Sequence, residues 1–437
     1  MVIMDSNLLT VLGAYNPWLN KPGTQARQLK ASLPKPFIQR QRQFSIRPGR
    51  AELVIGPRQA GKSTWIRQAL SQSSESVLLL HAEELQIQEL ARSPALALDA
   101  LKDILRPETI LFFEEIQHLE DAPLFLKGLV DLDRQRKIVA TGSSSLVFQG
   151  RTRESLAGRA RRTLLLPFSL AEVTTTLDSA LVPAIREQKI AEFWDRLVVF
   201  GGYPESWFEA EPQETLRYLV EAFVLKDASD LHQIDRPSVF RKLLELAAAD
   251  IGNLVNISAW SSLAQASRSM AMRYLAIAEE AHILRMVAPF AEGKRLEVTG
   301  TPKVFFIDNG LRNAVFGGFA PSTNRADRGA LWENAVYSEL LKRLRLLDEI
   351  RFWRSKGGAE VDFIIRRGGT LVAVEVKAGA LPRPKLARSA RSFIEAYCPA
   401  CFAVINADLR HDMEVDGTPI HFLTPADLDR ALAYLPD

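Results

Sequence analysis

The sequence is poor in cysteine, in long apolar runs and in net charge, and each shortage excludes a class of protein. Only two cysteines, Cys398 and Cys401, occur among the 437 residues, so a disulfide framework is excluded and a reducing, cytoplasmic environment is expected. No run of about 18 consecutive apolar residues is present, which argues against a transmembrane helix and a membrane partner. Residues 1–10 carry Asp5 and no basic residue, so we do not expect a signal peptide.

The two cysteines form a single Cys-x-x-Cys spacing, from Cys398 to Cys401. A structural zinc site needs a second pair of ligands, which the sequence does not offer in a matching spacing. A redox role is the remaining alternative. We favour a buried turn that leads into a strand over Cys401–Ile405.

The net charge of +3 implies no partner by itself, but the basic residues are unevenly distributed. Residues 21–50 hold eight basic residues and no acid. Such an arm suits the phosphates of a nucleic acid, or it wraps around the chain's own core as a solvated segment. The sequence does not separate these alternatives. The eight residues are Lys21, Arg27, Lys30, Lys35, Arg40, Arg42, Arg47 and Arg50.

A complete P-loop pattern, G-x-x-x-x-G-K-[ST], is present in the context that such a loop requires. The apolar residues 53–55 predict a buried strand before it, and the helix that follows carries Trp65 and Ile66 on its apolar face. Glycines let backbone N–H groups surround phosphate oxygens, and the helix N-terminus adds positive potential. We therefore expect ATP here, with Lys62 on the β- and γ-phosphates and Ser63 on Mg²⁺. The loop comprises Gly56, Pro57, Arg58, Gln59, Ala60, Gly61, Lys62, Ser63 and Thr64.

The apolar residues 110–113 end in Glu114 and Glu115 and form a Walker B pattern. In this pattern the first acid binds Mg²⁺ and the second polarises the attacking water. Glu114 stands where most such proteins carry aspartate, and its extra methylene shifts the carboxylate relative to the octahedral geometry that Mg²⁺ requires. The alternative is a strand that runs into a helix with an acidic first turn, which the helix dipole favours.

Two later segments supply polar groups that we expect near the γ-phosphate. Residues 137–145 predict a strand that ends in small hydroxyl residues, and Ser143 is our candidate for the sensor that contacts the phosphate. Residues 156–162 contain several arginines, and Arg159 is our first candidate for stabilising charge on the transferred phosphate. A purely structural role for Arg159 is the alternative.

Together these motifs resemble those of predicted prokaryotic AAA+ ATPases that carry a C-terminal domain of unknown function. The P-loop is similar to the GPRQ-GKT loop of that family, and residues 114–117 are similar to its DEIQ. Two departures occur: Glu114 replaces the aspartate, which bears on the rate of hydrolysis, and Leu19 replaces a second tryptophan. The resemblance covers nearly the whole chain and implies an AAA+ core that uses ATP and Mg²⁺. Further similar runs are residues 16–18 (NPW), 141–144 (TGSS), 155–159 (SLAGR) and 201–205 (GGYPE).

The predicted fold class is α/β, with a P-loop AAA+ core, a helical lid, a winged-helix module and a C-terminal α/β domain that resembles PD-(D/E)XK nucleases. Tyr203, in the lid, either packs near the nucleotide or belongs to an ordinary core. The expected divisions are a basic arm (1–48), the ATPase core (49–170), the lid (171–235), the winged helix (236–300) and the nuclease-like domain (301–437).

The winged-helix prediction rests on three helical patterns, with Ser258 and Ser267 as expected N-caps, and on a hairpin that pairs residues 286–290 with residues 295–298. The recognition helix would begin at Ser267. Contact with DNA and a purely protein-binding role both stay open for this module. The residues expected to meet DNA are Arg268, Arg273, Tyr274, Lys294 and Arg295.

Two glycines at residues 368 and 369 separate two β-rich runs and predict a two-residue hairpin. We expect Arg367 to pair with Thr370. In that register Asp362 lies directly opposite Glu375, because side chains alternate between the two faces of a strand. The opposite face is then wholly apolar and is expected to be core: Val361, Phe363, Ile365, Val372, Val374 and Val376.

Two carboxylates that face each other across a hairpin repel, and a divalent metal between them removes this cost. We expect a second divalent metal, Mg²⁺ or Mn²⁺, between Asp362 and Glu375, with Lys377 beside them to stabilise phosphate charge or orient a water. This D…E-x-K pattern resembles that of PD-(D/E)XK nucleases, and Glu333 stands where they supply a third acid. The alternative is a solvent-facing hairpin whose charges pair across the strands, as Glu360 would with Lys377.

The sequence thus predicts a cytoplasmic ATPase that acts on DNA, with DNA cleavage by its C-terminal domain left open. The second hypothesis is a nucleotide-dependent switch or scaffold whose inert nuclease-like domain holds protein partners. A third is a structure-specific nuclease whose ATPase site is vestigial because of Glu114. Since AAA+ proteins often form rings, a homo-oligomer stays open, and Arg159 can act in its own subunit or in a neighbouring one.

Overall fold

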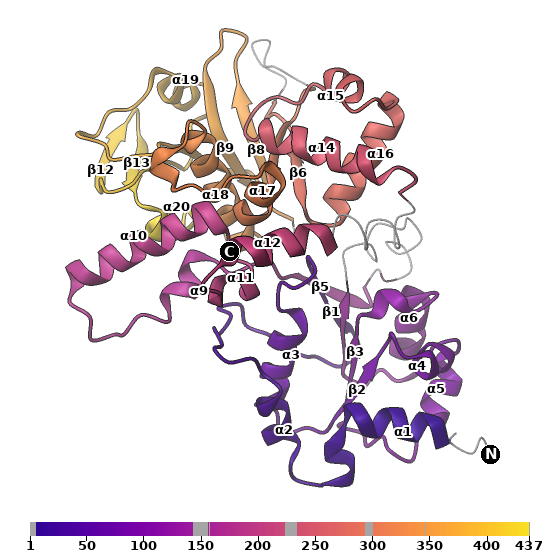
Figure 1. Ribbon diagram of the computed structural model, residues 1–437. Helices are drawn as coiled ribbons and strands as arrows, with labels where there is room; N and C mark the ends of the chain where they lie inside the picture. Colours follow the sequence, from indigo (N-terminus) through magenta and orange to yellow (C-terminus); the bar gives the residue numbers. More distant parts are fainter. Residues whose placement is uncertain are drawn as a thin grey trace. The chain divides into compact units, whose positions relative to one another are not determined.

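The fold is taken from a computed structural model that describes residues 6–142, 156, 158–222, 234–292, 300–345 and 347–436 (Figure 1). The chain divides into two compact units, residues 1–166 and 167–437, and each is described by itself. Among the described residues, no helix has both the length and the apolar character needed to cross a bilayer.

Unit 1 alternates strands with helices, as expected for a nucleotide-binding α/β fold. Its described elements are α1 (Ser6–Tyr15), η1 (Pro17–Asn20), α2 (Gln25–Ala31), β1 (Ala51–Ile55), α3 (Lys62–Ser71), β2 (Val77–His81), α4 (Leu85–Leu90), α5 (Pro94–Ala100), β3 (Ile110–Glu114), η2 (Ile116–His118), α6 (Ala122–Leu132), β4 (Ile138–Gly142) and β5 (Ala160–Leu164).

The five strands form one parallel sheet in the order β2-β3-β4-β1-β5. This order is consistent with a P-loop AAA core, and it brings β1 and β3 to either side of β4. Parallel strands end at the same edge, so the carboxyl ends of β1, β3 and β4 lie together there. Every residue of these three strands is buried, as expected where helices cover both faces of a sheet.

Helices cover the sheet of unit 1 on both faces, and each face has its own hydrophobic cluster (Figure 1). One cluster packs α1, α4, α5 and α6 against the sheet. The other packs η1, α2 and α3 against the opposite face, with Trp65 and Ile66 on the predicted apolar side of α3. The predicted strand–loop–helix order around the P-loop is therefore confirmed.

The N-terminal segment contacts the ATPase core through buried polar groups. Nε1 of Trp18 donates to the carbonyl of Val77 at 2.9 Å. Arg40 is buried and donates to the carbonyls of Leu166, at 3.0 Å, and of Ala60 in the P-loop. The part of the basic arm around Arg40 therefore follows the second alternative, in which the arm wraps around the chain's own core. Other basic residues of the arm are exposed: Lys21, Arg27, Lys30, Lys35, Arg47 and Arg50.

Unit 2 begins with helices and ends with a mixed sheet. Its described elements are α9 (Leu170–Thr174), α10 (Pro183–Phe200), α11 (Pro204–Phe208), α12 (Pro212–Glu221), α14 (Pro237–Ala249), α15 (Ile257–Leu263), α16 (Arg268–Glu280), β6 (Leu284–Val287), β7 (Lys303–Phe306), α17 (Asn309–Phe316), η4 (Ser322–Asn324), α18 (Arg328–Arg343), β8 (Glu349–Arg354), β9 (Glu360–Arg367), β10 (Thr370–Val376), α19 (Arg388–Tyr397), β11 (Cys401–Ile405), β12 (His411–Val415), β13 (Thr418–Leu423), η5 (Pro425–Asp427) and α20 (Leu428–Leu432).

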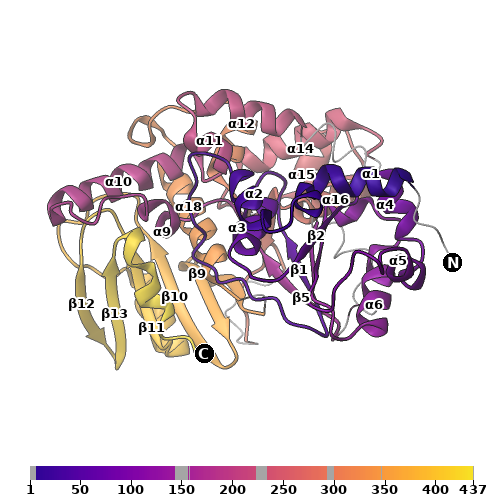
Figure 2. The same ribbon diagram turned by 90° about the horizontal axis from the view of Figure 1, so that it is seen from below.

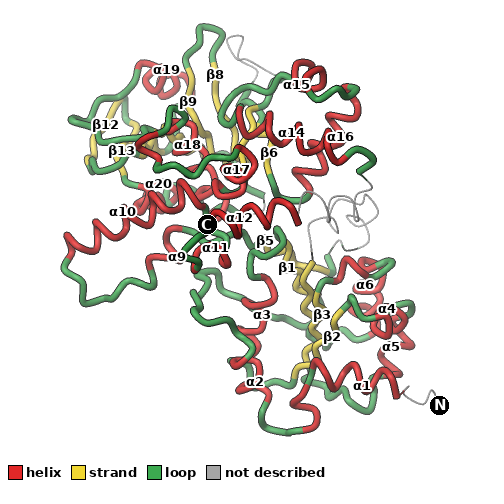
Figure 3. Tube along the Cα trace, viewed as in Figure 1, coloured by secondary structure: helices red, strands yellow, loops and turns green. Residues whose placement is uncertain are grey.

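The Gly201-Gly202 turn follows α10 and contacts Asp308 at the start of α17, a helix that packs against α10, α12 and α14 (Figure 3). Asp308 caps α17 and accepts a hydrogen bond from the backbone N–H of Gly202 at 2.7 Å. A Cβ atom on Gly201 would lie 1.9 Å from Oδ1 of Asp308, so only glycine fits. Tyr203 is buried in the core of unit 2. Its burial favours the prediction of an ordinary core residue over that of a residue packed near the nucleotide.

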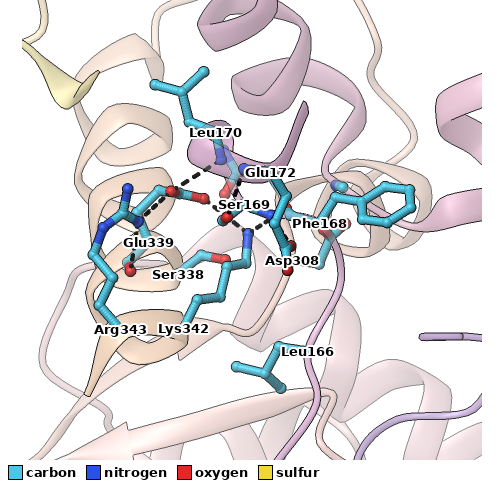
Figure 4. A network of polar contacts seen from close by, with 12 residues as sticks. Leu166, Phe168, Ser169, Leu170, Glu172, Asp308, Ser338, Glu339, Lys342 and Arg343 are labelled. Carbon is cyan, nitrogen blue, oxygen red and sulfur yellow. Dashed lines mark hydrogen bonds and ion pairs between the residues drawn. The ribbon is translucent and has the colours of Figure 1, made fainter. Parts of the chain in front are cut away.

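A buried polar network ties α9 to α18 (Figure 4). Glu339 accepts hydrogen bonds from the backbone N–H of Leu170 at 3.1 Å, from Lys342 at 3.0 Å and from Arg343 at 2.5 Å. Lys342 also donates to the carbonyl of Phe168 at 2.9 Å. Because the carboxylate has several charged and polar donors, burial of Glu339 does not leave its charge unpaired.

The helices α14, α15 and α16 agree with the three predicted helical patterns, but two details differ. Ser267 caps α16 as predicted, whereas the cap of α15 is Asn256 rather than Ser258, because the Asn256 side chain accepts from the Ala259 N–H. Tyr274 is fully buried, so the prediction that it faces DNA is wrong. It points inward because α16 packs this side against α14, where Tyr274 meets the ring of Phe240 edge-on.

The strand after α16 has a described partner that the sequence did not predict. Strand β6 pairs antiparallel with β7, from Leu284 opposite Phe306 to Val287 opposite Lys303. All four residues of β7 are buried, and the predicted partner, residues 295–298, lies outside the described residues, so that part of the prediction is not tested. Residues 293–299, which include Lys294 and Arg295, lie outside the described residues.

The C-terminal sheet has six strands in the order β12-β13-β11-β10-β9-β8, with parallel and antiparallel pairs, and several lie side by side in Figure 2. The predicted hairpin register is confirmed, because Thr370 pairs with Arg367. The last described pair is Val374 opposite Phe363, and the next pair would be the expected one of Glu375 opposite Asp362.

The expected apolar face of the hairpin is confirmed for Phe363, Ile365, Val372 and Val374, which pair with one another and are buried, but it is wrong for Val361, because β9 is irregular. Val361 pairs with Trp353 and Ile364 with Arg351, so two residues of β9 oppose a single residue of β8. Such a bulge interrupts the alternation of side chains. Val361 belongs to the cluster that contains α19, whereas Phe363 packs against Tyr337 of α18. Asp362 lies within this irregularity.

The strand predicted over Cys401–Ile405 is β11. Cys401 is buried, and burial raises the pKa of its thiol to about 12. Cys398 is exposed and has a left-handed backbone conformation at the end of α19. Since a redox pair needs a reactive thiolate, the geometry favours the turn over the redox alternative.

Candidate functional site

The P-loop connects β1 to α3 at the edge of the sheet where the parallel strands end. A Cβ atom on Gly56 would lie 2.0 Å from the carbonyl oxygen of Leu165, and Gly61 has φ of 88° as the N-cap of α3. Both glycines are therefore required by the geometry. Pro57 and Ala60 are buried, whereas Arg58 and Gln59 are exposed at the tip of the loop and Ser63 and Thr64 are half-buried in the first turn of α3.

Lys62 is the buried cation of this loop. Its Nζ atom donates to the carbonyl of Gly56 at 3.2 Å and to that of Pro57 at 3.0 Å. Neutral carbonyls compensate an ammonium ion less well than phosphate oxygens do. The side chain is thus held inside the loop, at the position that the phosphate chain of a nucleotide requires.

Glu114 ends β3 and is buried, and its Oε2 accepts a hydrogen bond from Nη2 of Arg67 on α3 at 2.6 Å. Its Oε1 is buried with no hydrogen-bond partner among the described residues. A buried, half-satisfied carboxylate is an acceptor for a further cation or donor. This ion pair links the P-loop helix to the Walker B strand.

Glu115 follows directly and adopts a left-handed conformation with φ of 52°, which is costly for a residue with a Cβ atom. Its backbone N–H donates to Oγ1 of Thr141 at 3.0 Å, and its Oε2 accepts from Nε2 of Gln117 at 2.6 Å. The two contacts fix the backbone and the carboxylate of the predicted base.

Arg159 and Ser143 are the other two residues predicted for this site. Arg159 is partly exposed, and its Nε donates to Asp131 at 2.7 Å, so it is held by a carboxylate of its own unit. Ser143 lies outside the described residues. Thr141, two residues earlier, is the penultimate residue of β4, and its hydroxyl accepts a hydrogen bond from the backbone N–H of Glu115.

Mg·ATP fits this arrangement. The glycine-lined loop leaves no room for a side chain at Gly56, the ammonium of Lys62 is buried beside the carbonyls of Gly56 and Pro57, and Oε1 of Glu114 has no hydrogen-bond partner among the described residues. These features offer a cation for phosphate and an acid for Mg²⁺. The site therefore has the groups that phosphoryl transfer requires.

A second cluster of charges lies in unit 2, where β7, α18, β9 and β10 approach one another. The Nζ atom of Lys303 lies 3.1 Å from Oε1 of Glu333 and 2.5 Å from Oε1 of Glu360. Asp362 accepts a hydrogen bond at Oδ2 from the backbone N–H of Val376 at 2.7 Å. The predicted acids Glu333 and Asp362 are thus brought together, with a lysine among them.

Burial dominates the electrostatics of this cluster. It raises the pKa of Glu333 well above its usual range, and the neighbouring Asp362 adds to the shift while Lys303 opposes it. Burial also raises the pKa of Asp362, against the hydrogen bond from Val376. The pKa of Lys303 is raised because its two carboxylate neighbours outweigh the cost of burial. The cluster therefore favours added positive charge.

Glu375 and Lys377 lie at the end of β10. Oε1 of Glu375 is 2.5 Å from Nζ of Lys377, whose side chain is 48% exposed, so Lys377 pairs along its own strand. The alternative pairing of Glu360 with Lys377 is therefore wrong, since Glu360 pairs with Lys303 and Arg354. Oε2 of Glu375 is buried without a hydrogen-bond partner in the described part of the chain.

The residues of this cluster do not fit the second metal that the sequence suggested. Within the described ranges, no three histidine, cysteine, aspartate or glutamate side chains are grouped so that they could hold a metal ion. Lys303 instead supplies a positive charge between Glu333 and Glu360. We therefore derive no chemistry from a metal at Asp362 and Glu375.

Sequence reasoning missed four residues that contact the predicted ones: Arg67, Gln117, Thr141 and Lys303. Thr141 had a readable signal, since a hydroxyl residue at the end of a strand beside Walker B faces the same edge. Gln117 follows the two acids in the motif that the family resemblance had already identified. Arg67 and Lys303 carry no local pattern, because their partners are distant in the sequence.

Comparison with known domain families divides the chain into three matched segments. Residues 49–174 match an AAA domain, residues 191–322 match a domain of unknown function (DUF8612), and residues 328–423 match another domain of unknown function (DUF4143). The AAA segment contains the P-loop and both Walker B acids. The chain therefore has an AAA domain, which indicates ATP binding and hydrolysis, followed by two domains rather than one of unknown function.

Relatives that match most of the chain occur in two bacteria and an archaeon. An uncharacterized protein of Mycobacterium tuberculosis and one of Mycobacterium bovis are each 25% identical to the chain over 445 residues, covering 97% of the chain and 94% of the relative. An uncharacterized protein of Methanocaldococcus jannaschii is 23% identical over 346 residues, covering 75% of each.

Proposed function

We propose that this protein hydrolyses Mg·ATP in unit 1 and uses the cycle to change its interaction with DNA. The observation that carries the ATPase part is the convergence of the P-loop with Glu114 and Glu115 at one edge of an AAA-type sheet. The position of Lys62 and the open acceptor on Glu114 support the same conclusion.

In this proposal the loop residues change partners when the nucleotide binds. Lys62 leaves the carbonyls of Gly56 and Pro57 and binds the β- and γ-phosphates. Ser63 and Glu114 hold Mg²⁺, which supplies charge neutralisation at the phosphate oxygens. Glu114 must exchange its contact with Arg67 for this role.

Glu115 is the proposed base. Its carboxylate orients the attacking water and takes up its proton, while Thr141 holds the backbone in the left-handed conformation that aims the side chain. Arg159 is proposed to stabilise charge on the γ-phosphate once it leaves Asp131. Ser143 is proposed as a further phosphate contact.

DNA is the proposed macromolecular partner. Its support is the set of exposed basic residues on the N-terminal arm, together with Arg268 and Arg273 on α16, if residues 236–300 form a winged helix as the sequence suggests. Arg273 forms an ion pair with Asp235 at 3.4 Å, which a phosphate would replace. Phosphate contacts of this kind weaken as salt rises.

The test of this function is the rate of ATP hydrolysis by the full chain with and without linear, nicked or branched DNA. The proposal expects Mg²⁺-dependent hydrolysis that at least one form of DNA changes by about threefold or more, with an effect that weakens at higher salt. A rate that no DNA changes, together with no DNA binding at low salt, would favour the switch or scaffold that holds protein partners.

DNA cleavage by Glu333, Asp362, Glu375 and Lys377 is a second candidate, which would require Lys303 to leave Glu333 and Glu360 before Mg²⁺ or Mn²⁺ could bind, because the described arrangement does not fit a metal. The buried, unpartnered Oε2 of Glu375 favours it. The test compares cutting of the same DNA substrates by wild type and Glu375→Ala, with Mg²⁺ or Mn²⁺ and with or without ATP. Cutting lost in the variant supports the candidate, and the absence of cutting by either chain contradicts it.

A further inference from the structure

Lys303 is the most enclosed cation of the acidic cluster in unit 2. Its side chain is 4% exposed, whereas that of Lys377 is 48% exposed. The Nζ atom is bounded by Glu333 of α18, Glu360 of β9 and the ring of Phe352 in β8, whose centroid lies 5.4 Å away. One ammonium group therefore contacts three elements of the C-terminal domain.

Lys303 does not belong to the segment that supplies the acids. It is the first residue of β7, within the stretch that matches DUF8612, and the acids lie within the stretch that matches DUF4143. Its strand is held by pairing with β6, so its position is set by the preceding domain. The charge balance of the cluster thus depends on a residue that another domain contributes.

The cluster contains more negative charge than the described cations directly contact. Lys303 meets Glu333 and Glu360, and Lys377 meets one oxygen of Glu375. The other oxygen of Glu375 is buried and without a hydrogen-bond partner in the part of the chain that the structure describes. Oε2 of Glu375 takes no part in the ion pairs of Lys303, and it is an acceptor that no described donor contacts.

We propose that Lys303 is the built-in counter-ion of this cluster and that it excludes a divalent cation from the carboxylates of the C-terminal domain. An ammonium ion and a divalent metal both require direct contact with the same carboxylate oxygens, so they exclude each other. Removing the ammonium leaves Glu333 without its contacting cation and Glu360 with Arg354 alone, which a divalent ion relieves.

This inference concerns the site of the second candidate function and does not rest on ATP hydrolysis. If Lys303 excludes the metal, the wild-type chain in this conformation lacks metal-dependent cleavage because no divalent ion reaches the carboxylates. Metal binding is measured directly, so a failure of the inference is distinguishable from a failure of the cleavage proposal.

The test measures Mn²⁺ binding to the full chain without nucleotide, with electron paramagnetic resonance as the readout. The chains compared are wild type, Lys303→Met, Glu375→Gln and the double variant. We expect Lys303→Met to gain a site that binds Mn²⁺ at least about tenfold more tightly than any wild-type site that depends on Glu375. The double variant should lose this gain. Lys342→Met, which removes a buried lysine from the Glu339 network, should gain no site.

Two results would overturn the inference. One is a wild-type Mn²⁺ site that Glu375→Gln removes and Lys303→Met does not strengthen. The other is a folded Lys303→Met variant that binds no more Mn²⁺ than wild type. If Lys303→Met fails to fold without metal, the test is thermal unfolding of the wild-type chain with and without Mn²⁺. We expect Mn²⁺ to leave the Tm of wild type unchanged. A rise in Tm that is absent from Glu375→Gln would contradict the inference.

Discussion

Arg67 and Glu114 form an ion pair in which Nη2 of the arginine lies 2.6 Å from Oε2 of the carboxylate. Glu114 is the acid that Mg²⁺ requires in the proposed ATPase cycle, so the arginine and the metal compete for it. The pair also explains how glutamate is accommodated where aspartate is expected, because its longer side chain has a partner on the P-loop helix.

Replacing Arg67 by methionine should destabilise unit 1 and strengthen binding of Mg·ATP. Glu114 is 2% exposed and would lose its counter-ion, at a cost of about 2 kcal/mol in the free energy of unfolding. Mg·ATP no longer has to break the pair, so its Kd should fall. Urea denaturation and titration with a fluorescent nucleotide measure the two effects. Arg92→Met, at an exposed arginine of the same unit, is the control, and a weaker affinity in Arg67→Met would contradict the account.

Thr141→Val should slow hydrolysis without weakening ATP binding. The substitution preserves shape but removes the acceptor for the Glu115 N–H, at a cost of about 1–3 kcal/mol. The left-handed backbone of Glu115 would then relax and misdirect the carboxylate, so kcat should fall about tenfold. Thr141→Ser retains the hydroxyl and should keep most of the rate. An unchanged kcat in the valine variant would show that Thr141 does not position the base.

Gly201→Ala should destabilise unit 2 more than Gly317→Ala does. Both glycines have positive φ, but a Cβ atom on Gly201 meets the Asp308 carboxylate at 1.9 Å, whereas nothing lies within 4 Å of one on Gly317. The control carries only the backbone strain of about 1–2 kcal/mol, and the clash adds to this at Gly201. Urea denaturation compares the two. Equal losses of stability would mean that Asp308 moves aside without cost.

Cys398 should be the thiol that reacts in the folded protein. Cys398 is exposed, whereas Cys401 is buried and its pKa is raised to about 12, so at pH 8 its thiolate is scarce. Alkylation followed by mass spectrometry should modify Cys398 alone until urea unfolds unit 2. Cys398→Ser should abolish the early reaction, and Cys401→Ser should leave it intact. A disulfide that forms readily between the two residues would restore the redox alternative.

The sequence predicted the parts of the fold that depend on short, local patterns. The P-loop, the Walker B acids and the register of the hairpin from Arg367 to Thr370 follow from motif spacing and alternation. The same is true of the cap at Ser267 and of strand Cys401–Ile405. In each case the residues that determine the structure are neighbours in the chain.

Features that depend on distant partners were predicted incorrectly or not at all. The bulge at Asp362 and Phe363 arises from pairing with β8, which the hairpin sequence does not reveal. Tyr274 is buried because α14 packs against α16, although its position on the helix is also compatible with an exposed face. Lys303 reaches acids that lie 30 or more residues away in the sequence, so no spacing rule could identify it.

The most direct test of the central claim compares wild type with Glu115→Gln in the presence of Mg·ATP. The account predicts steady phosphate release by the wild-type chain and a rate lower by about a hundredfold or more in the variant, with ATP still bound by both. The glutamine keeps the shape of the side chain but cannot take up a proton. Equal rates in the two chains, or no ATP binding by either, would contradict the claim that unit 1 hydrolyses ATP with Glu115 as its base.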